Sequence, residues 1–214
     1  MLLIDVDKLA QQQKVKILFL SQIIRMKFNY KLVTFTLLLV IITTLSKLFF
    51  STKMAWSGFS PIIAISLFAG MMVKDKTASF LLPLASLFIS DVIIEVLFRF
   101  NLFPYEGLYK YQLLNYSILL ITTLLGWALK GRNYTRIAVG ALAAPTLFFF
   151  LSNFSIWITS DGVTYTKDFS GLVTCLIAGL PFYGHSLAAI VLFLPVFLFS
   201  YNYITKKETG LLLA

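Results

Sequence analysis

The sequence predicts an all-α membrane protein, a polytopic bundle of about six transmembrane helices. Of its 214 residues, 59% are hydrophobic and only 13% are charged, whereas about 25% of a soluble domain is charged. The apolar residues form long continuous runs without period-two alternation. In lipid, the backbone of such runs closes its hydrogen bonds within helices, so a β-barrel is not expected.

The chain divides into three parts. Residues 1–31 mix apolar and basic side chains, which fits a cytoplasmic or interfacial amphipathic segment. It fits equally well that Met26 is the true first residue. Residues 32–204 form the predicted membrane domain, and residues 205–214 form a cytoplasmic tail.

Each apolar run is compared with the roughly 20 residues needed to span a bilayer. The runs cover residues 32–50, 60–73, 77–98, 113–129, 135–158 and 171–204. The second run is short, and the last is too long for one simple span. Because Pro181 lies between Gly179 and Gly184, we expect the last helix to be broken there. Residues 171–180 would then be a short packed or re-entrant piece, and residues 186–204 the sixth span.

The basic residues predict the orientation. The net charge is +9, and Lys and Arg gather at 74–76, 130–136 and 206–207, between alternate runs. The positive-inside rule therefore places both termini in the cytoplasm, with the chain crossing a bacterial inner (plasma) membrane. Orientation explains this charge, so no nucleic-acid partner is expected.

Ionisable residues within the third run are the first candidates for function. Asp91, Glu95 and Arg99 follow one another at steps of four residues, on one helix face. They either anchor the helix at the membrane interface or line a polar cavity. Asp91 lies about 21 Å along the run, in the outer third of a roughly 30 Å core, and this depth favours the cavity.

Further polar and aromatic groups fall at a similar depth. In the predicted orientation, Asn153, Trp157, Tyr165, Tyr183 and His185 all lie towards the outer side. A ligand site there would use the carboxylates for a cationic or hydroxyl group, Asn153 for orientation and Trp157 for stacking. Trp and Tyr are also common at membrane interfaces, and a single His is also common as a packing residue.

The sequence carries no motif for catalysis. Cys175 is the single cysteine and His185 the single histidine, so no metal site or cofactor is expected. No G-x-S-x-G motif and no glycine-rich phosphate loop is present. Active transport would require a partner or an ion gradient.

Several short motifs run through most of the chain after residue 57. They are Pro61-x-x-Ala64-x-x-Leu67-Phe68-x-Gly70, Leu82-Pro83-Leu84, Ser90-Asp91, Ser152-Asn153-Phe154 with Trp157, Gly171-Leu172, and Ala178-Gly179-Leu180-Pro181-Phe182. With these motifs the chain resembles a family of uncharacterised bacterial six-helix membrane proteins. That family is similar in architecture to the substrate-binding (S) components of energy-coupling-factor vitamin transporters. The resemblance implies an outward-opening ligand site and a shared coupling module that contains ATPases.

The leading prediction is a binding or uptake component for a vitamin-like or metabolite-like small molecule. One alternative is an intramembrane enzyme acting on a lipid or isoprenoid, with Asp91 and His185 as acid and base. The other is a structural or assembly subunit without a ligand.

Overall fold

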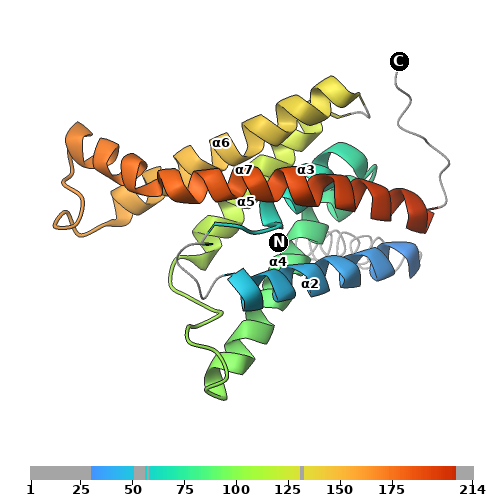
Figure 1. The fold of residues 1–214 in the computed structure, drawn as a ribbon, viewed down its shortest axis with the longest axis horizontal. Helices are drawn as coiled ribbons and strands as arrows, with labels where there is room; N and C mark the ends of the chain where they lie inside the picture. Colours follow the sequence, from blue (N-terminus) through green and yellow to red (C-terminus); the bar gives the residue numbers. More distant parts are fainter. Residues whose placement is uncertain (1–29, 51–55, 57, 131–132, 206–214) are drawn as a thin grey trace, which may run out of the picture. The chain divides into compact units, whose positions relative to one another are not determined.

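The computed structural model describes residues 30–50, 56, 58–130 and 133–205 of the chain (Figure 1). The chain divides into two compact units, residues 1–34 and 35–214. Of the first unit, only residues 30–34 are described, and they are helical. The elements are α2 (Tyr30–Phe50), α3 (Ile62–Met72), α4 (Lys76–Arg99), α5 (Gln112–Ala128), α6 (Tyr134–Thr159) and α7 (Phe169–Thr205). The described residues are therefore all-α, as predicted.

Four of these helices are long and apolar enough to cross a membrane. They are residues 31–50, 76–99, 134–159 and 169–204. Helix α5 has 17 residues, or about 25 Å of helix, and α3 has 11 residues, or about 16 Å. Each is shorter than the roughly 30 Å hydrocarbon core. The membrane character is thus supported, while a count of six spans and the direction of the termini stay predictions.

Helix α3 lies at the centre of the second unit. All 11 of its residues are buried, and it packs against α4, α5, α6 and α7. Gly70 of α3 faces Gly126 of α5 so closely that an added Cβ on Gly126 would lie 2.6 Å from the carbonyl oxygen of Leu67. Small residues permit such close helix crossings, so Gly70 and Gly126 serve the packing of α3 against α5.

Helix α7 corrects the prediction of a broken last span. It is one helix of 37 residues that contains both Pro181 and Pro195. A proline removes one backbone hydrogen bond, and neighbouring side chains in membrane helices can re-satisfy the freed groups. Gly184 adds no break because its backbone stays helical.

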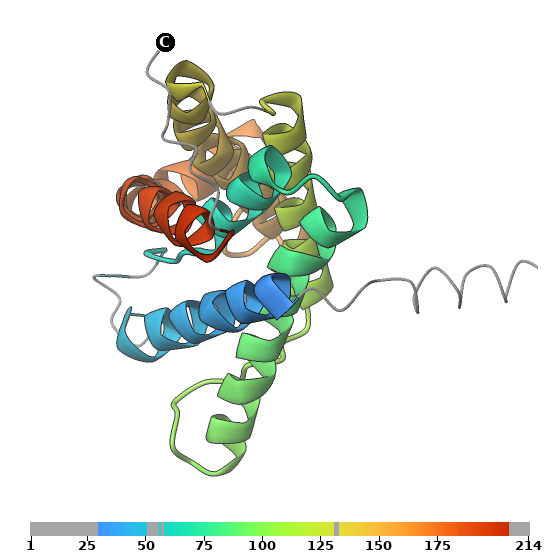
Figure 2. The same cartoon turned by 90° about the vertical axis from the view of Figure 1, so that its right-hand side faces the viewer.

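Helices α6 and α7 lie side by side in both views (Figures 1 and 2). Residues 35–50 of α2 belong to the second unit and contact its other helices through side chains. At one end, the Phe35 ring lies 5.3 Å from that of Phe68. At the other end, Lys47 forms an ion pair with Asp91 of α4. That ion pair is the centre of the candidate site.

Candidate functional site

Three helices bring polar side chains together around Asp91, which is only 5% exposed. Lys47 of α2 donates to Asp91 Oδ1. Gln112 and Tyr116 of α5 both donate to Asp91 Oδ2, the tyrosine hydroxyl at 2.6 Å. Gln112 Nε2 also donates to the Tyr116 hydroxyl oxygen at 2.7 Å. We call Lys47, Asp91, Gln112 and Tyr116 the Asp91 cluster.

The connection between α4 and α5, residues 100–111, closes over this end of α4 (Figure 1). Glu95 accepts hydrogen bonds from the backbone N–H groups of Gly107 and Leu108, each at 3.2 Å, and from Arg99 Nε at 2.8 Å. A Cβ at Gly107 would collide with the carbonyl oxygen of Asp91 and the amide nitrogen of Glu95. Asp91 and Glu95 lie on one face of α4, as predicted, and the 100–111 connection packs against that face.

The same connection supplies a buried hydroxyl group. Tyr105 Oη is buried and makes no hydrogen bond within the described part of the chain. Burial, together with the negative charge of Asp91, raises the pKa of Tyr105 to about 12. The hydroxyl therefore stays protonated, and it is an unused hydrogen-bond donor near a buried carboxylate.

Asn153 lies elsewhere, in the interface of α6 and α7, and is 7% exposed. Its Nδ2 donates to the carbonyl oxygen of Phe149, one turn earlier in α6, at 2.8 Å. The Cys175 thiol of α7 lies 3.4 Å from the Asn153 backbone oxygen and 3.9 Å from Asn153 Oδ1. The Asn153 side chain is thus held between the two helices.

Trp157 and Tyr165 belong to the capped end of α6. Trp157 Nε1 donates to the carbonyl oxygen of Thr166 at 2.8 Å. Lys167 Nζ donates to the carbonyl oxygens of Trp157 and Ile158, at 2.5 and 3.0 Å. The Tyr165 carbonyl oxygen accepts from Ser160 Oγ at 3.4 Å. Residues 159–169 therefore cap α6 with their own groups.

Two carboxylates stabilise the 159–169 connection. Asp161 accepts from the backbone N–H groups of Val163 and Thr164, which lowers its pKa. Asp168 accepts from the Thr166 hydroxyl and from the backbone N–H of Gly171, which lowers its pKa as well. Both carboxylates thus favour their charged forms in this turn.

Tyr183 and His185 contact still other groups. The Tyr183 hydroxyl is 2.8 Å from Thr146 Oγ1 of α6, and its ring lies 5.0 Å from that of Phe149. The His185 ring is stacked on Trp56, with centroids 6.2 Å apart. The hydrogen-bond partners of the Asp91 carboxylate are Lys47, Gln112 and Tyr116.

Comparison with known proteins gives one match. Residues 26–211 match the model of a family of unknown function, DUF6580. The chain belongs to this DUF6580 family. No curated protein and no solved structure matches the chain.

In this DUF6580 protein, the seven predicted site residues lie in two regions. Asp91 and Glu95 share one region. The other five, Asn153, Trp157, Tyr165, Tyr183 and His185, lie along α6, α7 and their connection. Among the described residues, no hydrogen bond or ion pair joins either carboxylate to Asn153, Trp157, Tyr165 or Tyr183. Nor do three His, Cys, Asp or Glu side chains gather as a metal site in the described part of the chain.

Sequence reasoning missed the partners of Asp91. Lys47 is in the last turn of an apolar helix, where a basic residue is usually explained by the orientation of the helix in the membrane. Its position one span away from a buried Asp was the available clue to a pair, because intramembrane charges usually pair with one another. Gln112 and Tyr116 are one helical turn apart in α5, a spacing that puts both on one face.

Proposed function

We propose that this chain is a small-molecule binding or uptake component of the membrane, with the Asp91 cluster as its ligand-binding centre. The supporting observation is the buried ion pair of Lys47 and Asp91, which Gln112 and Tyr116 complete from a third helix. The five other predicted residues, from Asn153 to His185, are assigned to the packing and capping of α6 and α7.

The energetics of buried charge favour function over packing. An ionised side chain in the hydrocarbon core is costly, and the cost reaches about 2.5–3.5 kcal/mol at the centre of a membrane helix on insertion scales. Asp91 and Lys47 lie nearer to helix ends, where this cost is smaller but remains unfavourable. A buried ion pair is often no more stable than apolar residues of the same volume. The Lys47–Asp91 pair therefore adds little stability to a bundle that only has to pack. In a ligand site, the same pair offers two opposite charges for binding.

The chemistry of the cluster indicates the kind of ligand. A cationic or hydroxyl-bearing group would take the place of Lys47 at Asp91 Oδ1. The buried Tyr105 hydroxyl, which has no hydrogen-bond partner among the described residues, would supply one more hydrogen bond. Entry of the ligand requires the 100–111 connection to open at its contacts with Glu95.

The resemblance to S components of energy-coupling-factor transporters supports a role in uptake. In such an arrangement, a coupling module with ATPases supplies the energy, and this chain supplies the binding site. Co-purification from native bacterial membrane tests this part of the proposal, with ATPase subunits expected to accompany the chain. Isolation of the chain with no ATPase subunit contradicts coupling to such a module.

A ligand screen tests the binding site. Purified protein is heated with vitamins and metabolites that carry amino or hydroxyl groups, and the melting temperature is recorded. We expect a ligand that raises it in the wild type and has no effect in Asp91→Asn. Glu106→Gln, an exposed carboxylate in the 100–111 connection, is the matched control and should keep the response. A ligand that stabilises Asp91→Asn equally would remove Asp91 from the site.

A further inference from the structure

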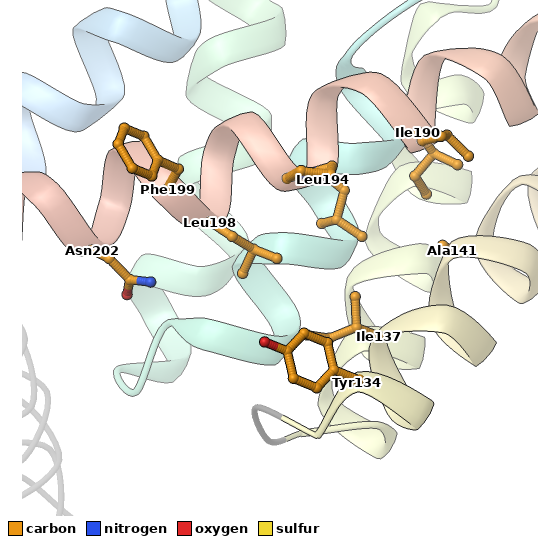
Figure 3. Close-up of a pocket in the computed structure, with 10 residues that line it drawn as sticks. Tyr134, Ile137, Ala141, Ile190, Leu194, Leu198, Phe199 and Asn202 are labelled. Carbon is orange, nitrogen blue, oxygen red and sulfur yellow. The ribbon is translucent and has the colours of Figure 1, made fainter. Parts of the chain in front are cut away.

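The Asp91 cluster differs in charge from the cavity between α6 and α7. That cavity has a volume of about 520 Å³, and its wall is mostly apolar, with Ile137 of α6 and Leu194 of α7 among its lining residues (Figure 3). None of the described residues that line it carries a charge. The Asp91 cluster contains both a carboxylate and an ammonium group. These two charges indicate the class of ligand that the cluster binds.

The two carboxylate oxygens of Asp91 have partners of different kinds. Oδ2 accepts from two neutral groups of α5, the Gln112 amide and the Tyr116 hydroxyl. Oδ1 accepts from the ammonium group of Lys47 on α2. The Lys47 side chain is 18% exposed, against 7% for that of Asp91, and a lysine stem is long and flexible. Lys47 is therefore the partner that a ligand can displace, while α5 holds the carboxylate in place.

Charge balance restricts the ligand that can separate Lys47 from Asp91. Removing one partner of a buried ion pair is strongly destabilising, because the other charge stays buried and uncompensated. A ligand with only a cationic group would pair with Asp91 and leave Lys47 without this carboxylate. A ligand with only a hydroxyl group would compensate neither charge. A zwitterion compensates both, since its ammonium group pairs with Asp91 and its anionic group pairs with Lys47.

The Tyr105 hydroxyl gives independent support for an anionic group on the ligand. Its oxygen is buried and has no hydrogen-bond partner among the described residues. Burial, and after it the charge of Asp91, raises the pKa of Tyr105 to about 12, so the hydroxyl stays protonated near that carboxylate. A buried donor is costly to leave unused. A carboxylate on the ligand is an acceptor that forms a strong, charge-assisted hydrogen bond with such a donor.

We propose that the Asp91 cluster binds a small zwitterion that carries an N–H-bearing ammonium group and a carboxylate, as an amino acid does. The ammonium group of the ligand donates to Asp91 Oδ1, and its carboxylate accepts from Lys47 Nζ and Tyr105 Oη. Lys47 and Asp91 thus pair with each other before binding and with the ligand after it. This inference rests on the proposed function, because it names the ligand class of the same site.

Thermal shifts with charge-blocked analogues test the ligand class. Purified wild-type protein in detergent is heated with a panel of α-, β- and γ-amino acids, and with the methyl ester and the N-acetyl derivative of each. We expect at least one amino acid to raise the melting temperature by at least about 3 °C. Each derivative lacks one charge and should have less than about a third of that effect. No response to any amino acid, or equal responses to an amino acid and its methyl ester, overturns the zwitterion.

Two variants separate the effect of charge from that of ligand size. In Lys47→Met the cluster keeps only its negative charge, so the cationic methyl ester should bind better than the amino acid, the reverse of the wild type. Tyr105→Phe removes one hydrogen bond to the ligand carboxylate and should weaken binding of the amino acid about tenfold. Tyr111→Phe, at an exposed tyrosine of the same connection, is the matched control and should bind as the wild type does.

These variants also keep the test decisive if Lys47→Met does not fold, because Tyr105→Phe leaves the ion pair intact. Equal affinities of the two tyrosine variants overturn the contact with Tyr105. An unchanged preference for the amino acid in Lys47→Met overturns the contact with Lys47.

Two further results distinguish this inference from the proposed function. The headgroup of phosphatidylethanolamine also carries an ammonium group and an anionic group, so this lipid is added to the micelles as a separate arm. Stabilisation by the lipid and by no amino acid overturns the small zwitterion and contradicts the uptake role as well. A metabolite without a carboxylate that stabilises the wild type and not Asp91→Asn overturns the zwitterion alone, and the proposed binding function stands.

Discussion

The Asp91 cluster and the 159–169 connection are both groups of hydrogen-bonded polar side chains, yet they are built differently. In the cluster, Lys47 and Asp91 are 44 residues apart, and Gln112 is 21 residues beyond Asp91. In the connection, hydrogen-bond partners such as Lys167 and Trp157 are within about ten residues. In the cluster, Asp91 and Gln112 are buried and Lys47 and Tyr116 are half-buried, whereas Asp161, Lys167 and Asp168 are exposed.

This difference separates a tertiary interaction from local capping. The connection satisfies the backbone groups that every helix end leaves open, so its polar residues have a sufficient structural reason. The Asp91 cluster satisfies no helix end and places two charges where a bilayer disfavours them. The ligand role proposed above therefore rests on the cluster and not on the connection.

The largest effect is expected from separating the buried charges. Asp91→Leu leaves Lys47 without its carboxylate and should lower the free energy of unfolding by about 3–5 kcal/mol. The double variant Lys47→Met/Asp91→Leu should recover most of that loss, because no unpaired charge stays buried. Denaturant titration in detergent micelles measures both. If the single and double variants lose the same free energy of unfolding, the Lys47 ammonium group reaches water once Asp91 is replaced. The ion pair would then not be protected from solvent.

A smaller loss is expected at the contact that seats the 100–111 connection on α4. Gly107→Ala introduces a methyl group against the backbone of Asp91 and Glu95 and should cost about 1–3 kcal/mol of unfolding free energy. Gly184→Ala is the matched control, since a Cβ there has no heavy atom within 4 Å. It should be neutral or gain up to about 1 kcal/mol from helix propensity. Similar effects of the two variants would contradict the tight seating.

The local cap of α6 should contribute less. Lys167→Ala removes the ammonium group from the last carbonyl oxygens of α6 and should cost about 0.3–1 kcal/mol. Lys110→Ala, an exposed lysine over the Tyr111 ring, serves as the control and should change stability by less than about 0.5 kcal/mol. A loss at Lys167 as large as that at Asp91 would remove the contrast between the two regions.

The smallest effect is expected from acid. The pKa values of Asp161 and Asp168 are lowered in the folded chain from the ordinary value of 3.8. A depressed carboxyl pKa stabilises the fold above the unfolded value, and this contribution is lost as the pH falls through the folded values. Below pH 3.8 the 159–169 connection should loosen, and the fluorescence of Trp157 in a variant that lacks the other tryptophans should report it. Asp161→Asn/Asp168→Asn should flatten this acid transition; an unchanged transition would assign it to other carboxylates.

The helices themselves could be predicted from the sequence. The run at 113–129 corresponds to α5 (Gln112–Ala128), and the run at 135–158 to α6 (Tyr134–Thr159). The agreement has a simple reason, since a continuous apolar run in lipid must close its backbone hydrogen bonds internally. Asp91 and Glu95 were also correctly placed on one face, because the helical repeat fixes that relation.

Only the tertiary structure decided which polar groups meet. Equal depth in a membrane places two residues at one level but not on neighbouring faces, so Asp91 and Asn153 were grouped although they lie in separate regions. Lys47 and Gln112 join Asp91 through the packing of α2 and α5, which no local pattern encodes. Likewise, Pro181 is a helix breaker by local rules, and only its surroundings in α7 let the helix continue. Composition and periodicity thus determined the membrane helices, and side-chain packing between distant segments determined the site.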